Sequence, residues 1–411
     1  MSTDADYTLQ PVPKDKRKGL LSMFMIMLGF TFFSASMWTG QKLAEGMDLN
    51  GFLWALLLGG LILSAYTGAL GYIGANSGMT LDMLSRRSFG QKGSWLPSAM
   101  IAFTQIGWFG VGIAMFAIPV VTQILHLEAT PDSMPWEGYA IVGLAGLLMT
   151  ATAYFGIKSL AIISYIAVPS VAILGTVAMV MAVQQGEGSL ASRFAIGTKD
   201  MTLFSGIGLV IGSFVSGGTS TPNFTRFAGS KWAGLWVTVV AFLLGNSLMF
   251  FFGAISSIYV GGNDIFEVMI NLGLFYAALI VLGLNIWTTN DNAIYTSGLG
   301  LSNIFGLPKR ILVLVAGGIG TLLAVWLYWN FCDWLNILNC TLPPLGAILI
   351  LDYFLGKRER KTVQVNWCCV IGVIAGAIIA NIVSWGIASI NGMAVAALCY
   401  LADQLIFNKT K

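Results

Sequence analysis

Long runs of apolar residues follow one another along the whole chain, and only short polar stretches separate them. A helix that crosses the hydrocarbon core of a bilayer needs about 20 such residues. The pattern therefore predicts an all-α membrane protein. We place twelve transmembrane helices near residues 19–45, 52–77, 95–125, 138–156, 160–184, 203–222, 233–260, 274–300, 310–327, 330–354, 367–387 and 391–408.

Small and polar residues interrupt two of these segments at corresponding places. The first segment contains Ser34-Ala35-Ser36, and the sixth contains the run Ser216 to Ser220. Irregular backbone at membrane depth is tolerated only where it is buried in protein or lines a cavity. Paired interruptions of this kind mark the substrate sites of secondary transporters. We therefore predict that helices 1 and 6 are broken; the alternative is that these small residues serve helix packing.

The spacing of the two broken segments fits two halves of opposite orientation. Five helices separate their starts, so the second half enters the membrane with the opposite polarity. We expect a cytoplasmic N-terminal tail at 1–18 and one transporter domain at 19–408. Within that domain, repeat one would cover about 19–184, repeat two about 203–354, and two extra helices about 367–408.

Composition supports the membrane assignment, and the charges give its orientation. Only 9% of the 411 residues are charged, against about 25% in soluble domains. Alternating the segments from a cytoplasmic start leaves only Lys42, Arg193 and Lys199 among the basic residues outside. This follows the positive-inside rule and predicts that both termini are cytoplasmic. The net charge of +3 then reflects topology and does not indicate nucleic-acid binding.

A polar stripe lies within the eighth apolar segment. Asn285, Thr288, Thr289 and Asn292 follow the i, i+3, i+4, i+7 spacing and share one helical face, which must point into the bundle. With carbonyls from the broken first segment, the two hydroxyls would form an uncharged, all-oxygen site. Such oxygens can replace the hydration shell of Na⁺. The alternative is that the threonines bond only to carbonyls of their own helix.

A proton relay would instead need a carboxylate at membrane depth. The candidates are Asp291 in the eighth segment and Asp352 near the inner end of the tenth. Asp291 points about 100° or more away from the polar stripe, so we interpret it as a structural partner of a neighbouring helix. Sodium coupling is therefore the favoured interpretation.

The third and sixth segments combine aromatic and polar side chains. Gln105 and Trp108 are three residues apart, as are Ser213 and Ser216, with Phe214 between the two serines. Aromatic walls with amide and hydroxyl groups at their edge suit a flat, polar, uncharged heterocycle. Bases stack on aromatic side chains, and amides pair with the donor–acceptor edge of a nucleobase.

Several longer strings also resemble a known family. They are Pro11-Val-Pro13, Arg17-Lys-Gly19, Thr31 to Gly40, Gly93 to Pro97, Gln105 to Gly112, Met115 to Pro119, Pro222 to Phe227, Phe242 to Phe250 and Leu282 to Asn292. On these strings the chain resembles, along nearly its full length, the bacterial cytosine permeases of the nucleobase–cation symporter-1 family. The resemblance implies a transporter of the leucine-transporter type, with a five-plus-five inverted repeat, in the bacterial cytoplasmic membrane.

The resemblance also implies roles for individual residues. The base would stack between Trp108 and Phe214, and the resemblance places a Trp in hydantoin-carrying relatives where this chain has Phe214. The pyrimidine edge would be held by Gln105, Ser213, Ser216 and Asn285. The sodium site would comprise the carbonyls of Gly29, Phe32 and Asn285 with the hydroxyls of Thr288 and Thr289.

These observations together predict a transporter that imports cytosine with Na⁺ by alternating access. The expected partners are cytosine, Na⁺ as the coupling ion and the lipid bilayer, with no organic cofactor. The alternatives are a proton-coupled nucleobase permease, a sodium symporter of another small solute, and a passive channel. An enzyme is not expected, because no nucleophile–base or metal constellation is apparent in the sequence.

Overall fold

The computed structural model describes residues 7–155, 157–196, 198–262, 265–356 and 363–407. Every predicted apolar segment contains helix, and no strand occurs in these described ranges. Residues 1–6 of the predicted tail, and residues 156 and 408 at the ends of predicted segments, lie outside them. The helices on the predicted segments are α1 (Leu20–Thr31), α2 (Ser34–Gly46), α3 (Leu49–Ser77), α5 (Trp95–Pro119), α6 (Trp136–Tyr154), α7 (Ile157–Gln185), α9 (Leu203–Gly212), α10 (Val215–Thr219), α12 (Lys231–Val240), α13 (Asn246–Val260), α15 (Phe275–Phe305), α16 (Lys309–Trp329), α17 (Phe331–Thr341), α18 (Pro343–Leu355), α19 (Trp367–Ile382) and α20 (Ala388–Phe407).

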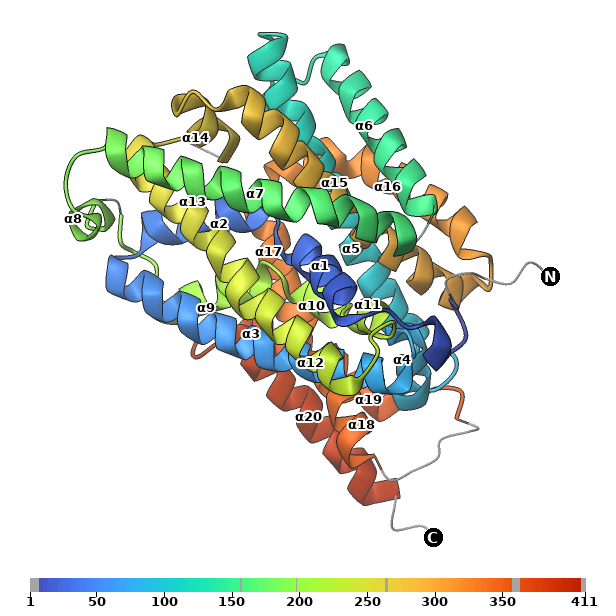
Figure 1. Cartoon of the computed structure of the whole chain (residues 1–411). Coiled ribbons are helices and arrows are strands. Elements are labelled where there is room, and N and C mark those ends of the chain that lie inside the picture. The colour runs from blue at the N-terminus through green and yellow to red at the C-terminus, as the bar shows by residue number, and fades with distance from the viewer. Residues whose placement is uncertain (1–6, 156, 197, 263–264, 357–362, 408–411) are drawn as a thin grey trace.

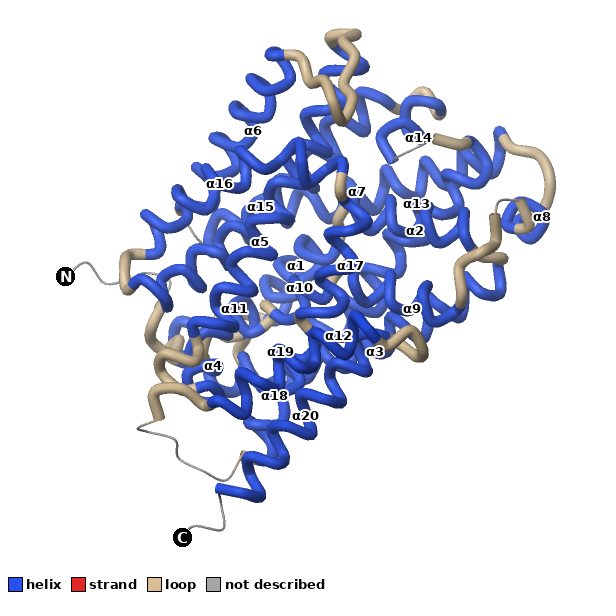
Figure 2. Tube along the Cα trace, turned by 180° about the vertical axis from the view of Figure 1, so that it is seen from behind, coloured by secondary structure: helices blue, strands red, loops and turns tan. Residues whose placement is uncertain are grey.

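Short helices connect these longer ones. They are α4 (Leu81–Phe89), α8 (Leu190–Phe194), α11 (Pro222–Thr225) and α14 (Ile265–Asn271). Two π-helical turns, at Val120–Ile124 and Ala241–Gly245, extend α5 and join α12 to α13. Figure 2 shows that the remaining connections are mostly short loops.

Six of the described helical segments are long and apolar enough to cross a membrane alone, and α1 with α2 would add a seventh as one span bent by 50°. Two other apolar helices, α9 and α19, are shorter. The chain therefore has the helices of a multi-pass membrane protein. The number of twelve crossings, the inverted repeat and the domain boundaries stay predictions.

The broken helices lie in the middle of the bundle. In Figures 1 and 2, α1 and α10 are surrounded by the longer helices, and α19 and α20 lie side by side at one edge. Among the main packing pairs are α15 on α5, α2 on α13 and α3 on α12. In Figure 1, α8 lies at the left of the bundle and α4 at the lower right, so they mark opposite ends.

The first break is two residues earlier than the sequence predicts. Phe32 and Phe33 have extended backbone (φ −75°, ψ 93° and φ −135°, ψ 132°), whereas Ser34 to Ser36 already belong to α2. The Ser36 hydroxyl donates a hydrogen bond of 2.7 Å to Asn246 Oδ1. The small residues at this position therefore allow α2 to pack closely on α13.

The second break is also displaced from the predicted run. It falls at Ser213 and Phe214, between α9 and α10, and most of the run Ser216 to Ser220 is helical. Within this run, a Cβ on Gly217 would lie 2.7 Å from the rings of both Phe214 and Phe30. Glycine here lets two aromatic rings approach the backbone of α10.

Candidate substrate and cation site

The end of α1 presents backbone carbonyls to the polar face of α15. The last carbonyls of any helix have no partner further along it, and they carry the negative end of the helix dipole. The Thr288 hydroxyl lies 3.3 Å from the Gly29 carbonyl and donates a 2.8 Å hydrogen bond to the Asn285 carbonyl. The Thr289 hydroxyl lies 3.3 Å from the same Asn285 carbonyl. These groups are buried and close together.

The Asn285 side chain holds the break between α1 and α2 in place. Its Oδ1 accepts a 2.9 Å hydrogen bond from the Ser34 backbone N–H, and its Nδ2 donates to the Phe32 carbonyl. The amide thus satisfies one donor and one acceptor of the interrupted backbone. It also brings the Phe32 carbonyl to α15, beside the other predicted cation ligands.

The five predicted cation ligands therefore lie in one region, between the end of α1 and α15. All of them are uncharged oxygens, and the dipole of α1 adds negative potential there. Groups of this kind fit a hard monovalent cation. The structure also shows the threonines bonded to helix carbonyls, which is the arrangement that the alternative interpretation describes. The hydroxyl oxygens of Thr288 and Thr289 would need to turn their lone pairs toward an ion to bind it.

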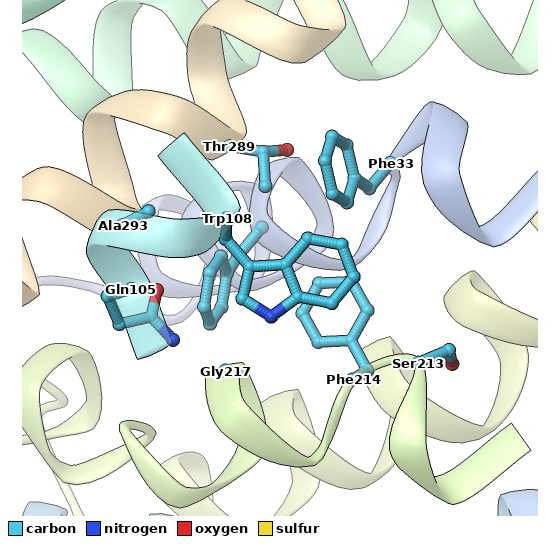
Figure 3. Close-up of a pocket in the computed structure, with 9 residues that line it drawn as sticks. Phe33, Gln105, Trp108, Ser213, Phe214, Gly217, Thr289 and Ala293 are labelled. Atoms are coloured by element: carbon cyan, nitrogen blue, oxygen red, sulfur yellow. The ribbon is translucent and has the colours of Figure 1, made fainter. Parts of the chain in front are cut away.

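A small pocket lies beside this group of oxygens (Figure 3). Its lining residues come from α1, the two breaks, α5, α10 and α15. They are Phe30, Phe33, Gln105, Trp108, Ser213, Phe214, Gly217, Thr289 and Ala293. The space open to the centre of a water-sized sphere is about 10 Å³, which is room for about one water molecule. A nucleobase could therefore enter only after the surrounding side chains move apart.

Aromatic rings form most of the walls of this pocket. The Trp108 ring makes edge contacts with Phe33 at 5.6 Å and with Phe331 of α17 at 5.9 Å between centroids. The Phe214 ring makes edge contacts with Phe30 at 5.3 Å and Phe242 at 5.4 Å. Figure 3 shows Trp108 and Phe214 next to each other at the pocket. The two predicted stacking partners are thus brought together.

The polar groups of the pocket come from α5, from the second break and, with Thr289, from α15. Gln105 Nε2 donates to Ser216 Oγ at 2.7 Å, and Ser216 donates to Thr104 Oγ1 at 2.9 Å. The Ser213 hydroxyl donates to the Val210 carbonyl at 2.8 Å. Ser216 does not line the pocket itself but orients Gln105, which does.

The structure adds lining residues that the sequence did not single out for the substrate: Phe30, Phe33, Gly217, Thr289 and Ala293. Most of them are apolar or small, and their types carry no chemical signal that distinguishes them from packing residues. Conversely, Asn285 does not line the pocket, because its amide is engaged at the α1–α2 break.

The two acidic candidates lie elsewhere. Asp291 accepts a 2.6 Å hydrogen bond from Thr152 of α6, which is the bond to a neighbouring helix expected from the sequence. Asp352 of α18 forms an ion pair of 3.2 Å with Arg87 of α4 and accepts from the Tyr400 hydroxyl of α20. Neither carboxylate lines the central pocket.

Two interrupted helices around a buried aromatic pocket, with uncharged oxygens beside it, are the features of a secondary transporter. Residues 11–367 match the family described as permeases for cytosine/purines, uracil, thiamine and allantoin. The chain therefore belongs to this family of permeases, which are transporters and not enzymes. It is 44% identical to the cytosine permease of Escherichia coli K12, with 100% of this chain and 96% of the relative covered.

Other known proteins share less of the sequence, and two solved structures share the fold. The hydantoin permease of Microbacterium maritypicum is 21% identical, over 81% of this chain and 75% of the relative. The structure of Mhp1, a nucleobase-cation-symport-1 family transporter in a closed conformation with bromovinylhydantoin bound, superposes with a TM-score of 0.82 at 18% identity. It covers 97% of this chain and 95% of that one. A Na⁺-coupled sialic acid symporter superposes with a TM-score of 0.72 at 12% identity, covering 95% and 91%.

Proposed function

We propose that the protein imports cytosine together with Na⁺ by alternating access across the bacterial cytoplasmic membrane, with both termini in the cytoplasm. Identity of 44% along the whole chain to a cytosine permease supports the substrate. The aromatic walls formed by Trp108 and Phe214 suit a planar ring. Gln105 and Ser213 offer an amide and a hydroxyl at its edge, while Ser216 holds Gln105.

The observation that best supports coupling between Na⁺ and substrate is the position of Thr289. This residue lines the aromatic pocket, and its hydroxyl also lies 3.3 Å from the Asn285 carbonyl among the proposed cation ligands. An ion held by Gly29, Phe32, Asn285, Thr288 and Thr289 would fix one wall of the substrate pocket. Because coupling is reciprocal, each ligand then raises the affinity of the other by the same factor.

The test is uptake of labelled cytosine into proteoliposomes that contain the purified protein. An inward Na⁺ gradient is compared with equal K⁺ and H⁺ gradients. We expect accumulation only with Na⁺. Accumulation of cytosine driven by H⁺ would contradict the assigned ion, and absence of cytosine uptake by folded protein would contradict the assigned substrate.

A second candidate, proton coupling, has one observation in its favour. The Oδ2 atom of Asp291 is buried and, within the described part of the chain, has no hydrogen-bond partner, although Oδ1 is bonded to Thr152. A protonated carboxyl would leave this atom uncharged. In the same uptake assay, Asp291→Asn should then abolish H⁺-driven accumulation, whereas under sodium coupling the gradient dependence should remain that of the wild type.

A further inference from the structure

A second and larger cavity lies between α9, α17 and the connection from α19 to α20. Its space for the centre of a water-sized sphere is about 400 Å³, many times that of the central pocket. Thr202, Ser205, Gly208 and Gly212 recur along one face of α9 and line it, together with Asn336 and Asn339 of α17 and the segment around Ser384. By the predicted topology this is the external end of the bundle.

The described lining of this outer cavity mixes polar and apolar residues and carries no charge. Two carboxamides face it from α17, at positions i and i+3, and hydroxyls come from Thr202, Ser205 and Ser384. The rest is apolar or glycine, including Phe204 and Leu335. Such a surface offers both donors and acceptors to an uncharged solute and gives no compensation to an ion, whose desolvation is costly.

Asn339 is the polar side chain of α17 that packs against the glycines of α9. It is 9% exposed, and its Oδ1 has no hydrogen-bond partner among the residues that the structure describes. A Cβ on Gly208 would lie 3.2 Å from its Nδ2, and a Cβ on Gly212 would lie 3.1 Å from its Cβ. The two glycines thus leave room for the carboxamide. A buried acceptor without a partner is unfavourable, so a small turn of this amide toward a polar solute in the cavity would be favourable.

The outer cavity and the central pocket are neighbours. Gly212, which lines the outer cavity, directly precedes Ser213, which lines the central pocket. On the other helix, Leu335 lines the outer cavity, and its neighbour Trp334 packs against Gly107 of α5. The two cavities therefore adjoin at consecutive residues of α9, and on α17 the residue next to Leu335 contacts α5.

We propose that the outer cavity is a second, weaker binding site for the transported heterocycle. The heterocycle binds there before a movement of α17 opens the central pocket to it. This inference rests on the proposed function. The carboxamides of Asn339 and Asn336 bind the solute. They form hydrogen bonds with the same donor–acceptor edge of the heterocycle that the central pocket binds. Neutral heterocycles are accepted and charged analogues are excluded.

The test uses a cysteine reporter in the full-length protein. Ser384→Cys lies on the cavity wall and is exposed, so a membrane-impermeant thiol reagent should modify it. Cytosine should slow this modification at least threefold, with or without Na⁺. Trp108→Ala, which disables the central pocket, should leave the half-protecting cytosine concentration unchanged. The control reporter is Ser133→Cys, which is also exposed and does not line the cavity.

Two variants then test the carboxamides of Asn339 and Asn336. Asn339→Leu should remove the protection of Ser384→Cys without changing the modification rate in the absence of cytosine. Asn336→Leu, at an exposed position, should weaken protection at least threefold even if Asn339→Leu fails to fold. Protection that persists in both variants, or that shifts with Trp108→Ala, would overturn the outer site. If the wild type shows no Trp108-dependent cytosine binding at all, it is the proposed function that fails.

Discussion

Thr289 belongs to both parts of the proposed site, the aromatic substrate pocket and the group of cation ligands. Its side chain lines the aromatic pocket, and its hydroxyl approaches a carbonyl of its own helix. In Figure 3 the hydroxyl lies on the side of Phe33. A change that keeps the shape of this side chain and removes only the oxygen would separate packing from ion binding.

Thr289→Val makes that change, because valine is nearly the same size and lacks the hydroxyl. A hydrogen bond or contact to a charged group contributes about 1.5–3 kcal/mol, so we expect the Na⁺ concentration for half-maximal uptake to rise roughly 10- to 100-fold. Cytosine affinity should fall with it at limiting Na⁺. The control is Thr238→Val, a buried threonine of α12 that bonds to a carbonyl of its own helix. Unchanged sodium activation would remove Thr289 from the cation site.

Asp82, at the start of α4, is the buried member of a polar network. Its Oδ1 accepts a 2.5 Å hydrogen bond from Ser98, which in turn accepts from Asn303 at 2.8 Å. Burial raises the pKa of the Asp82 carboxyl above its ordinary value, although the Ser98 bond and the positive charges of Arg226 and Arg86 partly offset this. Ionisation of this group is therefore less favourable in the folded protein than in water.

Because the folded pKa of Asp82 is raised, its contribution to stability is full below the unfolded pKa of about 3.9 and is lost as the pH rises through the folded pKa. Asp82→Asn keeps an acceptor for Ser98 and removes the titration. We expect the variant to gain stability relative to the wild type as the pH increases from 4 to 8, by roughly 1–3 °C in the unfolding midpoint. Unfolding of the detergent-solubilised protein measures this, with exposed Asp132→Asn as control. An equal difference at all pH values would contradict the prediction.

At the level of elements, the broken helices show what the sequence could and could not predict. The spacing of apolar residues predicted the helical segments, and the serine and glycine runs pointed to the correct two helices. The position of each break was wrong by two or three residues, because the small residues serve packing: Ser36 bonds Asn246, and Gly217 admits aromatic rings. The breaks fall instead at Phe33 and Phe214, whose role depends on tertiary contacts.

Some residues of the candidate site could also be predicted from the sequence, and others could not. The stripe of Asn285, Thr288 and Thr289 could be predicted to face the protein interior, because polar side chains on an apolar helix are costly to expose to lipid. Phe30 and Ala293 could not be assigned to the pocket, because an apolar side chain at a pocket and one in the core are identical in sequence. The role of the Asn285 amide at the break also depended on knowing that α1 ends at Thr31.

Asn285→Ala should therefore act on the break itself. The Ser34 N–H and the Phe32 carbonyl would lose their partner, and each unsatisfied buried group costs about 1–3 kcal/mol. We expect a lower unfolding midpoint and a smaller rise of that midpoint on adding Na⁺. Asn292→Ala is the control, because the Nδ2 of Asn292 bonds to a carbonyl of its own helix. A wild-type response to Na⁺ would show that this amide does not organise the cation site.

At the scale of the whole molecule, contacts join separate helices on both sides of the pocket. On the predicted external side, the Trp38 ring stacks on Phe331 at 4.5 Å between centroids and 8° between planes. On the predicted cytoplasmic side, Arg17 Nη1 donates to the Ala75 carbonyl at 2.6 Å, and the Lys18 N–H donates to the Phe227 carbonyl at 2.6 Å. The N-terminal segment thus ties α3 to the chain that follows α11.

Arg17→Ala should loosen the cytoplasmic side. We expect faster hydrogen exchange at the end of α3, and a several-fold weaker apparent affinity for external cytosine, because a smaller fraction of the protein would be in the outward-binding state. Lys16→Ala is the control, since its side chain is 60% exposed and pairs with its neighbour Asp15. Hydrogen exchange equal to that of the wild type would show that the N-terminal segment does not hold this side closed.

The small volume of the central pocket has a consequence for the ion gradients of a cell. A symporter must change back to its starting conformation without its substrate. A continuous column of water through the protein during that change would let ions leak down their gradient without driving transport. A pocket that contracts to the size of one water molecule, between Trp108 and Phe214, interrupts such a column. The aromatic walls that we propose for binding of the ring would then also prevent ion leakage through the unloaded carrier.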